Sequence, residues 1–238
     1  MRRLNIITPV KDSLSSTYET IEAILRSQID VPHSLTIYND RSTPANTAQL
    51  TKWAAEKGFR LVNIEDLTDH PSPNYLLVLQ TARREALAED AALAIVESDV
   101  VVDLQTLQRL YNGASERADC GIAAAVTVDD EGDINYPYEY ARKMKRGVID
   151  CKKHCSFCCS LLTPELLRRF DFDILDPTKN WYDVTISHES VKAGLKNYLF
   201  TELPVIHRPH GSRPWKQLKY TNPLKYYWLK FTRGLDKI

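Results

Sequence analysis

Short apolar runs and longer amphipathic segments alternate along the first half of the chain. The apolar runs are rich in β-branched residues and predict strands at 4–10, 34–39, 59–63 and 93–96. The segments after them carry apolar residues at helical spacing and predict helices at 11–28, from 44 onward, at 75–88 and at 104–118. This order of elements predicts an α/β fold in which helices flank a mostly parallel sheet.

The pattern becomes less regular after residue 118. Strands are predicted at 120–126, 156–162 and 198–206, and helices from 163 onward and at 181–194. A polar turn at 129–133 and an aromatic, basic stretch at 136–149 separate these elements. No repeat or low-complexity segment divides the sequence, so we expect one large domain followed by a tail.

The strand predicted at 93–96 runs directly into acidic residues. Glu97-Ser98-Asp99 places two carboxylates two positions apart, and side chains at i and i+2 of an extended chain point the same way. The carboxyl ends of parallel strands are where open α/β sheets bind ligands. Two hard oxygen donors there suit Mg²⁺ or Mn²⁺ shared with substrate phosphates. For this motif alone, a solvated acidic turn is the alternative.

Charge is balanced over the whole chain but not along it. The sequence has 31 Lys and Arg and 31 Asp and Glu, so it shows no sign of nucleic-acid binding. Beyond residue 204, eight Lys or Arg stand against one Asp. Residues 213–238 therefore predict a basic, aromatic, amphipathic tail that binds an anionic membrane surface. The apolar face of a helix in this tail would consist of Leu224, Trp228, Phe231 and Leu235. Docking of that helix on the body of the protein or on a second subunit is the alternative.

Four of the five cysteines lie close together, at Cys151, Cys155, Cys158 and Cys159. The sequence shows no signal peptide and no apolar stretch of about 18 residues. We therefore expect a cytoplasmic protein without disulfides, free or peripheral on the inner face of the membrane. Cys155 and Cys158, with His154 or Cys151, would suffice as zinc ligands, but no second such pair exists. A buried strand of small apolar residues is the favoured explanation of these cysteines.

Several motifs occur in an order that resembles inverting glycosyltransferases of family 2, over residues 3–212. Ile6-Ile-Thr-Pro-Val10 resembles the opening strand of that family, and Tyr38-Asn-Asp-Arg-Ser-Thr43 stands in the place of Val-Asp-Asp-Gly-Ser-Thr. Thr81-Ala-Arg-Arg-Glu-Ala86 stands in the place of Ala-Arg-Asn-x-Gly, and Glu97-Ser98-Asp99 in that of Asp-x-Asp. Trp181-Tyr182-Asp183 resembles the Glu-Asp pair that opens the acceptor-side helix, with the same eleven-residue step to Gly194. His207-Arg-Pro-His210-Gly-Ser212 resembles the late histidine segment of the family.

This resemblance implies the GT-A fold and a set of site residues. Residues 1–103 would form the nucleotide-sugar half of the domain, residues 104–212 the acceptor half, and residues 213–238 the tail. Asp183 would be the general base of the transfer. The nucleotide would lie against Thr8, Pro9, Asp40, Arg83, Glu97 and Ser98. Arg213 or Lys216 could clamp its phosphates. The ion, Mn²⁺ or Mg²⁺, would be held by Asp99 with His207 or His210.

The implied reaction moves a sugar from a nucleotide diphosphate sugar, most simply a UDP sugar, to a hydroxyl of a glycan or a lipid-linked acceptor. A divalent ion stabilises the departing diphosphate, and a carboxylate removes the proton of the attacking hydroxyl. Departures from the family pattern at Asn39, Glu97 and Tyr182 leave open a degenerate module that binds sugar nucleotides without turnover. A nucleotidyltransferase would carry a Gly-rich loop after the first strand, which this chain does not have.

Simpler roles are also open for three of the expected site residues. Asp40 could cap the following helix, and Asp183 could be an acid favoured at a helix N-terminus. Arg83 and its neighbour Arg84 could belong to a solvated helix face.

Overall fold

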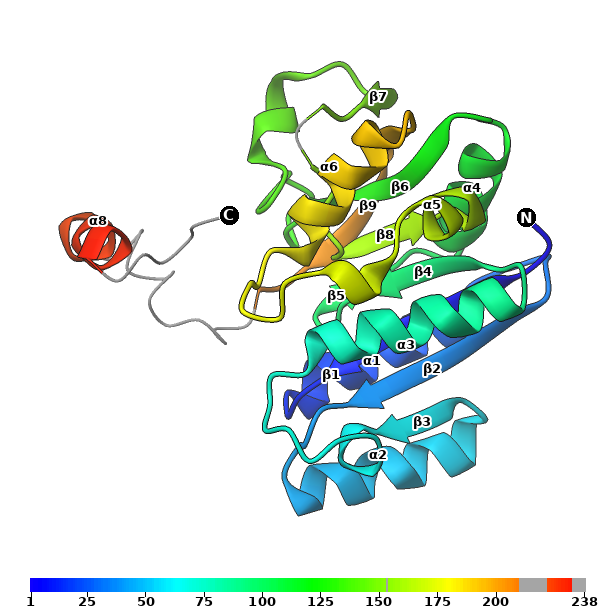
Figure 1. Cartoon of the computed structure of the whole chain (residues 1–238), viewed down its shortest axis with the longest axis vertical. Coiled ribbons are helices and arrows are strands. Elements are labelled where there is room, and N and C mark those ends of the chain that lie inside the picture. Colours follow the sequence, from blue (N-terminus) through cyan, green and yellow to red (C-terminus); the bar gives the residue numbers. More distant parts are fainter. Residues whose placement is uncertain (153, 210–221, 233–238) are drawn as a thin grey trace. The chain divides into compact units, whose positions relative to one another are not determined.

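The computed structural model describes residues 1–152, 154–209 and 222–232, and the chain forms two compact units, Met1–Arg208 and Pro209–Ile238. Within the described residues of the first unit, nine strands form one sheet (Figure 1) in the order β3-β2-β1-β4-β8-β6-β9-β5, with β7 beside β9. The strands are β1 (Leu4–Val10), β2 (His33–Asn39), β3 (Arg60–Asn63), β4 (Ala92–Val96), β5 (Val100–Val101), β6 (Cys120–Val128), β7 (Val148–Asp150), β8 (Cys159–Leu162) and β9 (Lys196–His207). The helices of this unit are α1 (Leu14–Arg26), α2 (Pro44–Lys57), α3 (Tyr75–Ala88), α4 (Thr106–Ser115), α5 (Pro164–Arg169) and α6 (Tyr182–Lys192), with 3₁₀ turns η1 (Ile64–Asp66), η2 (Glu139–Lys143) and η3 (Phe172–Ile174).

The sheet is mostly parallel, as the sequence predicts. β1 pairs in parallel with β2 and β4, β2 with β3, and β6 with β9. β8 is antiparallel to both β4 and β6, so these two strands also run in the common direction. The short strands β5 and β7 run antiparallel to β9. The carboxyl ends of β1, β2, β4, β6 and β9 therefore share one edge of the sheet, together with the beginning of β8.

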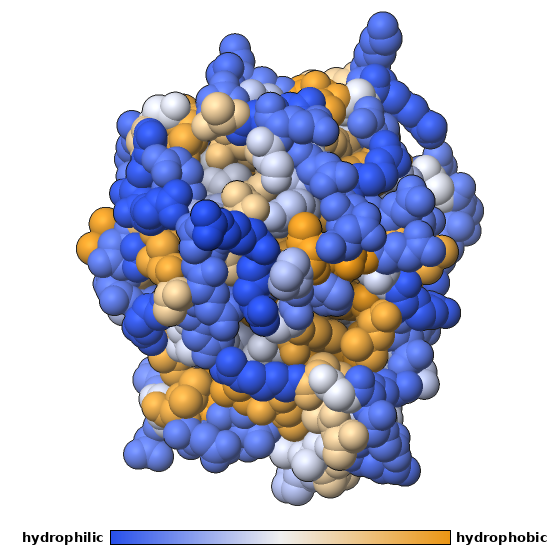
Figure 2. All heavy atoms as spheres, turned by 90° about the vertical axis from the view of Figure 1, so that its right-hand side faces the viewer, coloured by the Kyte–Doolittle hydropathy of each residue, from blue (hydrophilic) through white to orange (hydrophobic). Residues whose placement is uncertain are grey.

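Helices cover both faces of the sheet, and each face has its own apolar core. Helices α1, α2 and α4 pack on one face, against alternate residues of β1 such as Leu4 and Ile6. Helices α3, α5 and α6 pack on the other face, where Ile7 and Leu93 point. This opposite pointing of neighbouring strand residues follows from the period of two. Figure 2 looks at the side of the molecule where β1 and β2 begin; hydrophilic side chains cover most of it, with apolar ones between them.

Local sequence signals explain where several helices begin. Helix α3 spans the predicted residues 75–88. Helix α5 begins with Pro164 after Thr163, whose side chain accepts a hydrogen bond from the Leu166 amide, so the predicted cap is confirmed. Strand β8 begins at Cys159, three residues later than predicted.

The second unit contains one described helix, α8 (Pro223–Thr232). Its first turn is capped by Asn222, whose carboxamide oxygen accepts a hydrogen bond of 3.1 Å from the Lys225 amide. Leu224, Trp228 and Phe231 are 86%, 68% and 88% exposed, so the described helix presents an apolar face to solvent. In the described part of the chain, no helix combines the length and the apolar character that crossing a bilayer requires.

Candidate active site at the carboxyl edge of the sheet

Two strand pairings and the backbone hydrogen bonds beside them bring polar side chains together where β4 ends. The β4–β8 pairing matches Val96 with Cys159, and the Glu97 amide donates a hydrogen bond of 2.9 Å to the Cys158 carbonyl. The β5–β9 pairing matches Val100 with His207. The Arg208 amide then donates to the Asp99 carbonyl at 3.0 Å. The backbone therefore sets Cys158 beside Glu97 and His207 beside Asp99.

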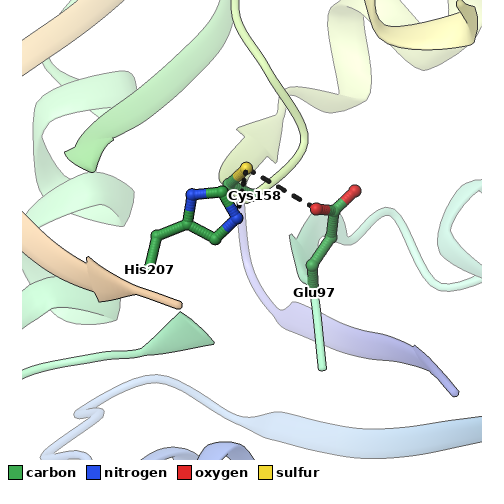
Figure 3. A group of neighbouring side chains, drawn as sticks. All are labelled: Glu97, Cys158 and His207. Atoms are coloured by element: carbon green, nitrogen blue, oxygen red, sulfur yellow. Dashed lines mark hydrogen bonds between the residues drawn. The ribbon is translucent and has the colours of Figure 1, made fainter. Parts of the chain in front are cut away.

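The side chains of these residues form a compact polar cluster (Figure 3). The Cys158 Sγ lies 3.5 Å from Glu97 Oε2 and 3.9 Å from His207 Nε2. The same Nε2 atom lies 3.7 Å from Asp99 Oδ2. Cys158, Asp99 and His207 are buried, whereas Glu97 is half-buried. Two carboxylates, an imidazole and a thiol thus meet at the edge where the sequence predicts a metal site.

Hydrogen bonding fixes the orientation of the His207 ring. Its Nδ1 lies 2.8 Å from the Tyr136 carbonyl, which can only accept, so Nδ1 carries the proton. Nε2 therefore directs a lone pair toward the cluster when the ring is neutral, as in metal-binding histidines whose other nitrogen is held by a carbonyl. Burial lowers the pKa of His207, but the nearby Asp99 carboxylate and the Tyr136 carbonyl outweigh burial and raise it above its ordinary value.

The cluster is electrostatically strained in the absence of a cation. Burial, followed by repulsion from Asp99, raises the pKa of Glu97 to about 7. Burial also raises the pKa of the Cys158 thiol, and the Glu97 charge adds to that effect. Both shifts reflect negative charge that is concentrated away from water. A divalent cation at this place would relieve the repulsion between the two carboxylates.

The first turns of α3 and α6 border the cluster. Asp183 lies in the first turn of α6, and its charge raises the pKa of Glu97. Tyr75 is the first residue of α3, and its ring lies 6.4 Å from that of Tyr182. The structure therefore brings the expected base, Asp183, near the expected metal ligands Asp99 and His207, although Asp183 lies more than 80 positions after Asp99 in the sequence.

Tyr75 is a site residue that the sequence did not indicate. Its hydroxyl is buried and has no hydrogen-bond partner within the part of the chain that the structure describes. Burial raises the pKa of this hydroxyl, and the charges of Glu97 and Asp183 add to the effect. A donor left unsatisfied beside two carboxylates is a candidate contact for substrate. No local pattern could have revealed it, since a tyrosine at the start of a helix is ordinary.

Several of the residues expected to contact the nucleotide lie at the same edge but differ in accessibility. Thr8 is fully buried, whereas Pro9 is half-buried near the end of β1. Ser98 is buried in the turn between the two acids. Asp40 follows β2, and its carboxylate accepts hydrogen bonds from Ser72 Oγ at 2.7 Å and from the Asn74 amide at 2.8 Å. Asp40 thus orders the loop before α3.

Arg83 makes structural contacts instead of facing this cluster. Its Nε donates to the Leu167 carbonyl at 3.0 Å, and its Nη1 pairs with Asp171 at 2.7 Å. It lies eight residues after Tyr75, about 12 Å farther along the helix axis. The structure gives no support to a nucleotide contact for Arg83. The expected metal ligand His210 and the expected nucleotide contact Arg213 lie outside the described residues.

The cysteine cluster does not form the zinc site considered from the sequence. All five cysteines are buried. Among the described residues, the His, Cys, Asp and Glu side chains that could jointly hold an ion are Glu97, Cys158 and His207, whose ligand atoms lie within 4.8 Å of one another. Cys151 instead donates its thiol to the His154 carbonyl at 3.2 Å.

Comparisons with known proteins support the fold. No protein-family model matches the sequence, and no curated protein matches it. Mannosyltransferase PcManGT from Pyrobaculum calidifontis, solved with GDP-Man and Mn²⁺, matches with a TM-score of 0.64 and 14% identity, over 96% of this chain and 64% of its own. This chain has a glycosyltransferase fold. S. aureus TarS 1-349 matches with a TM-score of 0.63 and 14% identity, over 86% of this chain and 60% of its own.

The same TarS fragment in complex with UDP-GlcNAc matches with a TM-score of 0.61 and 15% identity, over 89% of this chain and 60% of its own. The chain therefore spans less than two thirds of the length of the solved structures it matches. The predicted α/β glycosyltransferase fold is confirmed, while the low identity leaves donor, acceptor and mechanism to be inferred from the site.

Proposed function

We propose that this protein is an inverting glycosyltransferase that moves a sugar from a nucleotide diphosphate sugar to an acceptor hydroxyl. The observation that carries the proposal is the meeting of Glu97, Asp99 and His207 at the carboxyl edge of the sheet, with Asp183 nearby. The fold is shared with structures solved with GDP-Man and Mn²⁺ and with UDP-GlcNAc. Residues 1–103 would supply most of the donor side and residues 104–212 the acceptor side.

The donor side requires a divalent cation, and the residues present fit one. Carboxylate and imidazole ligands are suitable for Mn²⁺, and carboxylates also for Mg²⁺. Asp99 and His207 would hold the ion, with Glu97 beside them, and the Tyr136 carbonyl would keep His207 in the ligating tautomer. The bound ion would neutralise the charge that develops on the departing diphosphate.

The acceptor side requires a base, and Asp183 is the proposed one. An attacking hydroxyl must lose a proton while it approaches the anomeric carbon from the face opposite to the diphosphate. The Val184 amide donates a hydrogen bond of 2.9 Å to Asp183 Oδ1, which orients the carboxylate at the beginning of α6. A carboxylate held in this way can accept the proton directly.

A thermal-shift panel tests donor binding. UDP, GDP and their sugar conjugates would be added with and without Mn²⁺ to the wild type and to Asp99→Ala. At about 100 times its Kd, a ligand adds roughly 3 kcal/mol to the stability, which corresponds to about 6–12 °C for a domain of this size. We expect a Mn²⁺-dependent shift with a uridine nucleotide in the wild type alone. If no nucleotide shifts the wild type, the proposed donor site is wrong.

Substitution of the base separates turnover from binding. Asp183→Asn keeps the shape of the side chain, so the variant should retain the nucleotide-induced thermal shift. It should lose both sugar transfer and the slow hydrolysis of the donor. Glu189→Gln, on the same helix, is the matched control and should retain both activities. If wild type binds the nucleotide but neither hydrolyses nor transfers the sugar, the chain is a binding module and the proposed activity is refuted.

We propose further that the acceptor is a lipid-linked sugar or a glycan at a membrane surface, reached through the C-terminal unit. Helix α8 exposes Leu224, Trp228 and Phe231, and residues beyond 204 carry eight Lys or Arg against one Asp. A basic segment with an exposed aromatic face suits the interface of an anionic bilayer.

Vesicle co-sedimentation in the full-length chain tests this attachment. The double variant W228E/F231E should lose binding to vesicles that contain phosphatidylserine, while phosphatidylcholine vesicles should bind weakly throughout. Ile174→Glu, which changes a residue of the first unit that is 73% exposed, is the control and should bind like the wild type. Equal sedimentation of the wild type and W228E/F231E would exclude α8 as the anchor.

A further inference from the structure

Cys158 stands out because it places a sulfur atom inside a cluster of otherwise hard ligands. The sequence groups Cys158 with Cys155, three positions before it, and both cysteines are buried. The structure separates their roles. The Cys155 thiol faces the Tyr198 carbonyl at 4.0 Å, whereas the Cys158 thiol faces Glu97 and His207.

The distances around this sulfur match those of a ligand set. Zinc binds sulfur at about 2.3 Å and imidazole nitrogen at about 2.0–2.1 Å, so neighbouring ligands of a tetrahedral ion lie about 3.5 Å apart. Cys158 Sγ lies 3.5 Å from Glu97 Oε2 and 3.9 Å from His207 Nε2. Figure 3 shows the three side chains converging from the end of β4, the segment before β8 and the end of β9.

The surroundings of the cluster also favour ligation by sulfur. Cys158 is 3% exposed, so its contacts are fixed by packing and not by a mobile surface side chain. Its Sγ also lies 3.3 Å from Ser156 Oγ, a hydroxyl that can donate to a thiolate and orient it. The carbonyl of Cys158 accepts the Glu97 amide, which ties the two ligating segments together through the backbone.

We propose that Cys158 is a direct ligand of the divalent ion, together with Glu97 and His207, and that this centre therefore prefers thiophilic ions over Mg²⁺. Zn²⁺ and Co²⁺ accept thiolate, imidazole and carboxylate in one coordination sphere, whereas Mg²⁺ requires oxygen ligands and an octahedral arrangement. On binding, the thiol would release its proton to the buffer, and the resulting thiolate would donate an electron pair to the ion. Asp99, 3.7 Å from His207, is placed to complete the coordination.

Co²⁺ titration of the full-length protein tests this assignment without any sugar substrate. A Co²⁺–thiolate bond gives a charge-transfer absorption band in the near ultraviolet, which oxygen and nitrogen ligands do not give. We expect this band in the wild type and in Cys159→Ser, the neighbouring buried cysteine, and its loss in Cys158→Ser. Zn²⁺ should displace Co²⁺ and remove the band, whereas a large excess of Mg²⁺ should not.

The affinity for Zn²⁺ would be measured by competition with a chelating dye and should be lower in Cys158→Ser than in the wild type. Removing a residue that only hydrogen-bonds to a metal ligand lowers metal affinity by about 10–100-fold, so the loss of a direct ligand should cost at least as much. Circular dichroism would confirm that each variant is folded. Should Cys158→Ser not fold, protection of the wild-type Cys158 thiol from alkylation by Zn²⁺ replaces it. A wild type that binds Co²⁺ without the band, or a Cys158 that zinc does not protect, overturns the proposal. Mn²⁺-dependent nucleotide binding would be unaffected by that outcome, so this proposal and the proposed function can fail separately.

Discussion

Arg83 offers the sharpest test of the structure against the sequence, because the two assign it different roles. The family resemblance places it beside the nucleotide, whereas the structure uses it to join α3 to the segment after α5. Its side chain is only 11% exposed, and it contacts the Leu167 carbonyl at 3.0 Å and Asp171 at 2.7 Å. Its guanidinium carbon lies 5.6 Å from the centre of the Phe172 ring. Arg83→Ala removes all three contacts.

The expected loss can be worked out from these contacts. A hydrogen bond from a charged donor contributes about 1.5–3 kcal/mol. The ion pair adds at most about 1 kcal/mol, because the Asp171 side chain is 52% exposed. A cation–π contact adds about 0.5–1 kcal/mol. Because one guanidinium makes all of them, the contributions overlap, and we expect about 3 kcal/mol in total. For a domain of this size that is a fall in Tm of about 6–12 °C.

The neighbouring arginine is a matched control. Arg84 is 55% exposed and lies 3.5 Å from Asp173, so Arg84→Ala should lower the free energy of unfolding by less than about 1 kcal/mol. Both variants would be examined by urea unfolding and by nucleotide titration with Mn²⁺. We expect Arg83→Ala to lose stability and keep its nucleotide affinity. An Arg83→Ala protein with wild-type stability and weakened nucleotide binding would refute the structural role and support the role implied by the resemblance.

Three further predictions follow from buried groups. Tyr75→Phe should leave stability unchanged or raise it by about 1 kcal/mol, because the lost hydroxyl has no partner among the described residues. Sugar transfer should nevertheless fall. Urea unfolding checks the stability and a transfer assay checks the activity. In chelator, stability should fall as the pH rises from about 4.5 to about 7, because folded Glu97 retains a proton that the unfolded chain releases. Glu97→Gln should abolish that fall, and its free energy of unfolding at pH 8 should exceed that of the wild type by up to about 3 kcal/mol. A stability difference between the two proteins that is the same at pH 5 and pH 8 would contradict this prediction. Gly121→Ala should cost about 1–3 kcal/mol, since the new Cβ would clash with Ser190 Oγ. Adding Ser190→Ala should recover part of the loss in urea unfolding, and no recovery would exclude this clash.

Local patterns in the sequence were sufficient for most helices and the longer strands, and for the acids at the end of β4. Helical spacing located α3, and the Thr163-Pro164 signal located the start of α5, because caps and periodicity depend on neighbouring residues only. Arg41 illustrates a departure that leaves the backbone intact. It stands where the family has glycine and adopts a φ of 54°, in the left-handed region that glycine favours.

Long-range pairing decides what the sequence could not indicate. Cys158 reaches Glu97 through the β4–β8 pairing, and no spacing rule connects residues 61 positions apart. The structural contacts of Arg83 were hidden for the same reason, since its partners Leu167 and Asp171 lie 84 and 88 positions away. Tyr75 depends on the approach of α3 to α6, which is a matter of helix packing on the sheet.

The route by which the cluster is assembled has a mechanical consequence for the folded chain. Its three members come from the ends of separate strands, 61 and 49 positions apart in the sequence. An ion bound among them would act as a reversible cross-link that closes two long loops of the chain at once, whereas a disulfide closes one. Metal occupancy would then set how often the β5–β9 pair opens, and amide hydrogen exchange at Val101 and Ile206 would slow when the centre is loaded.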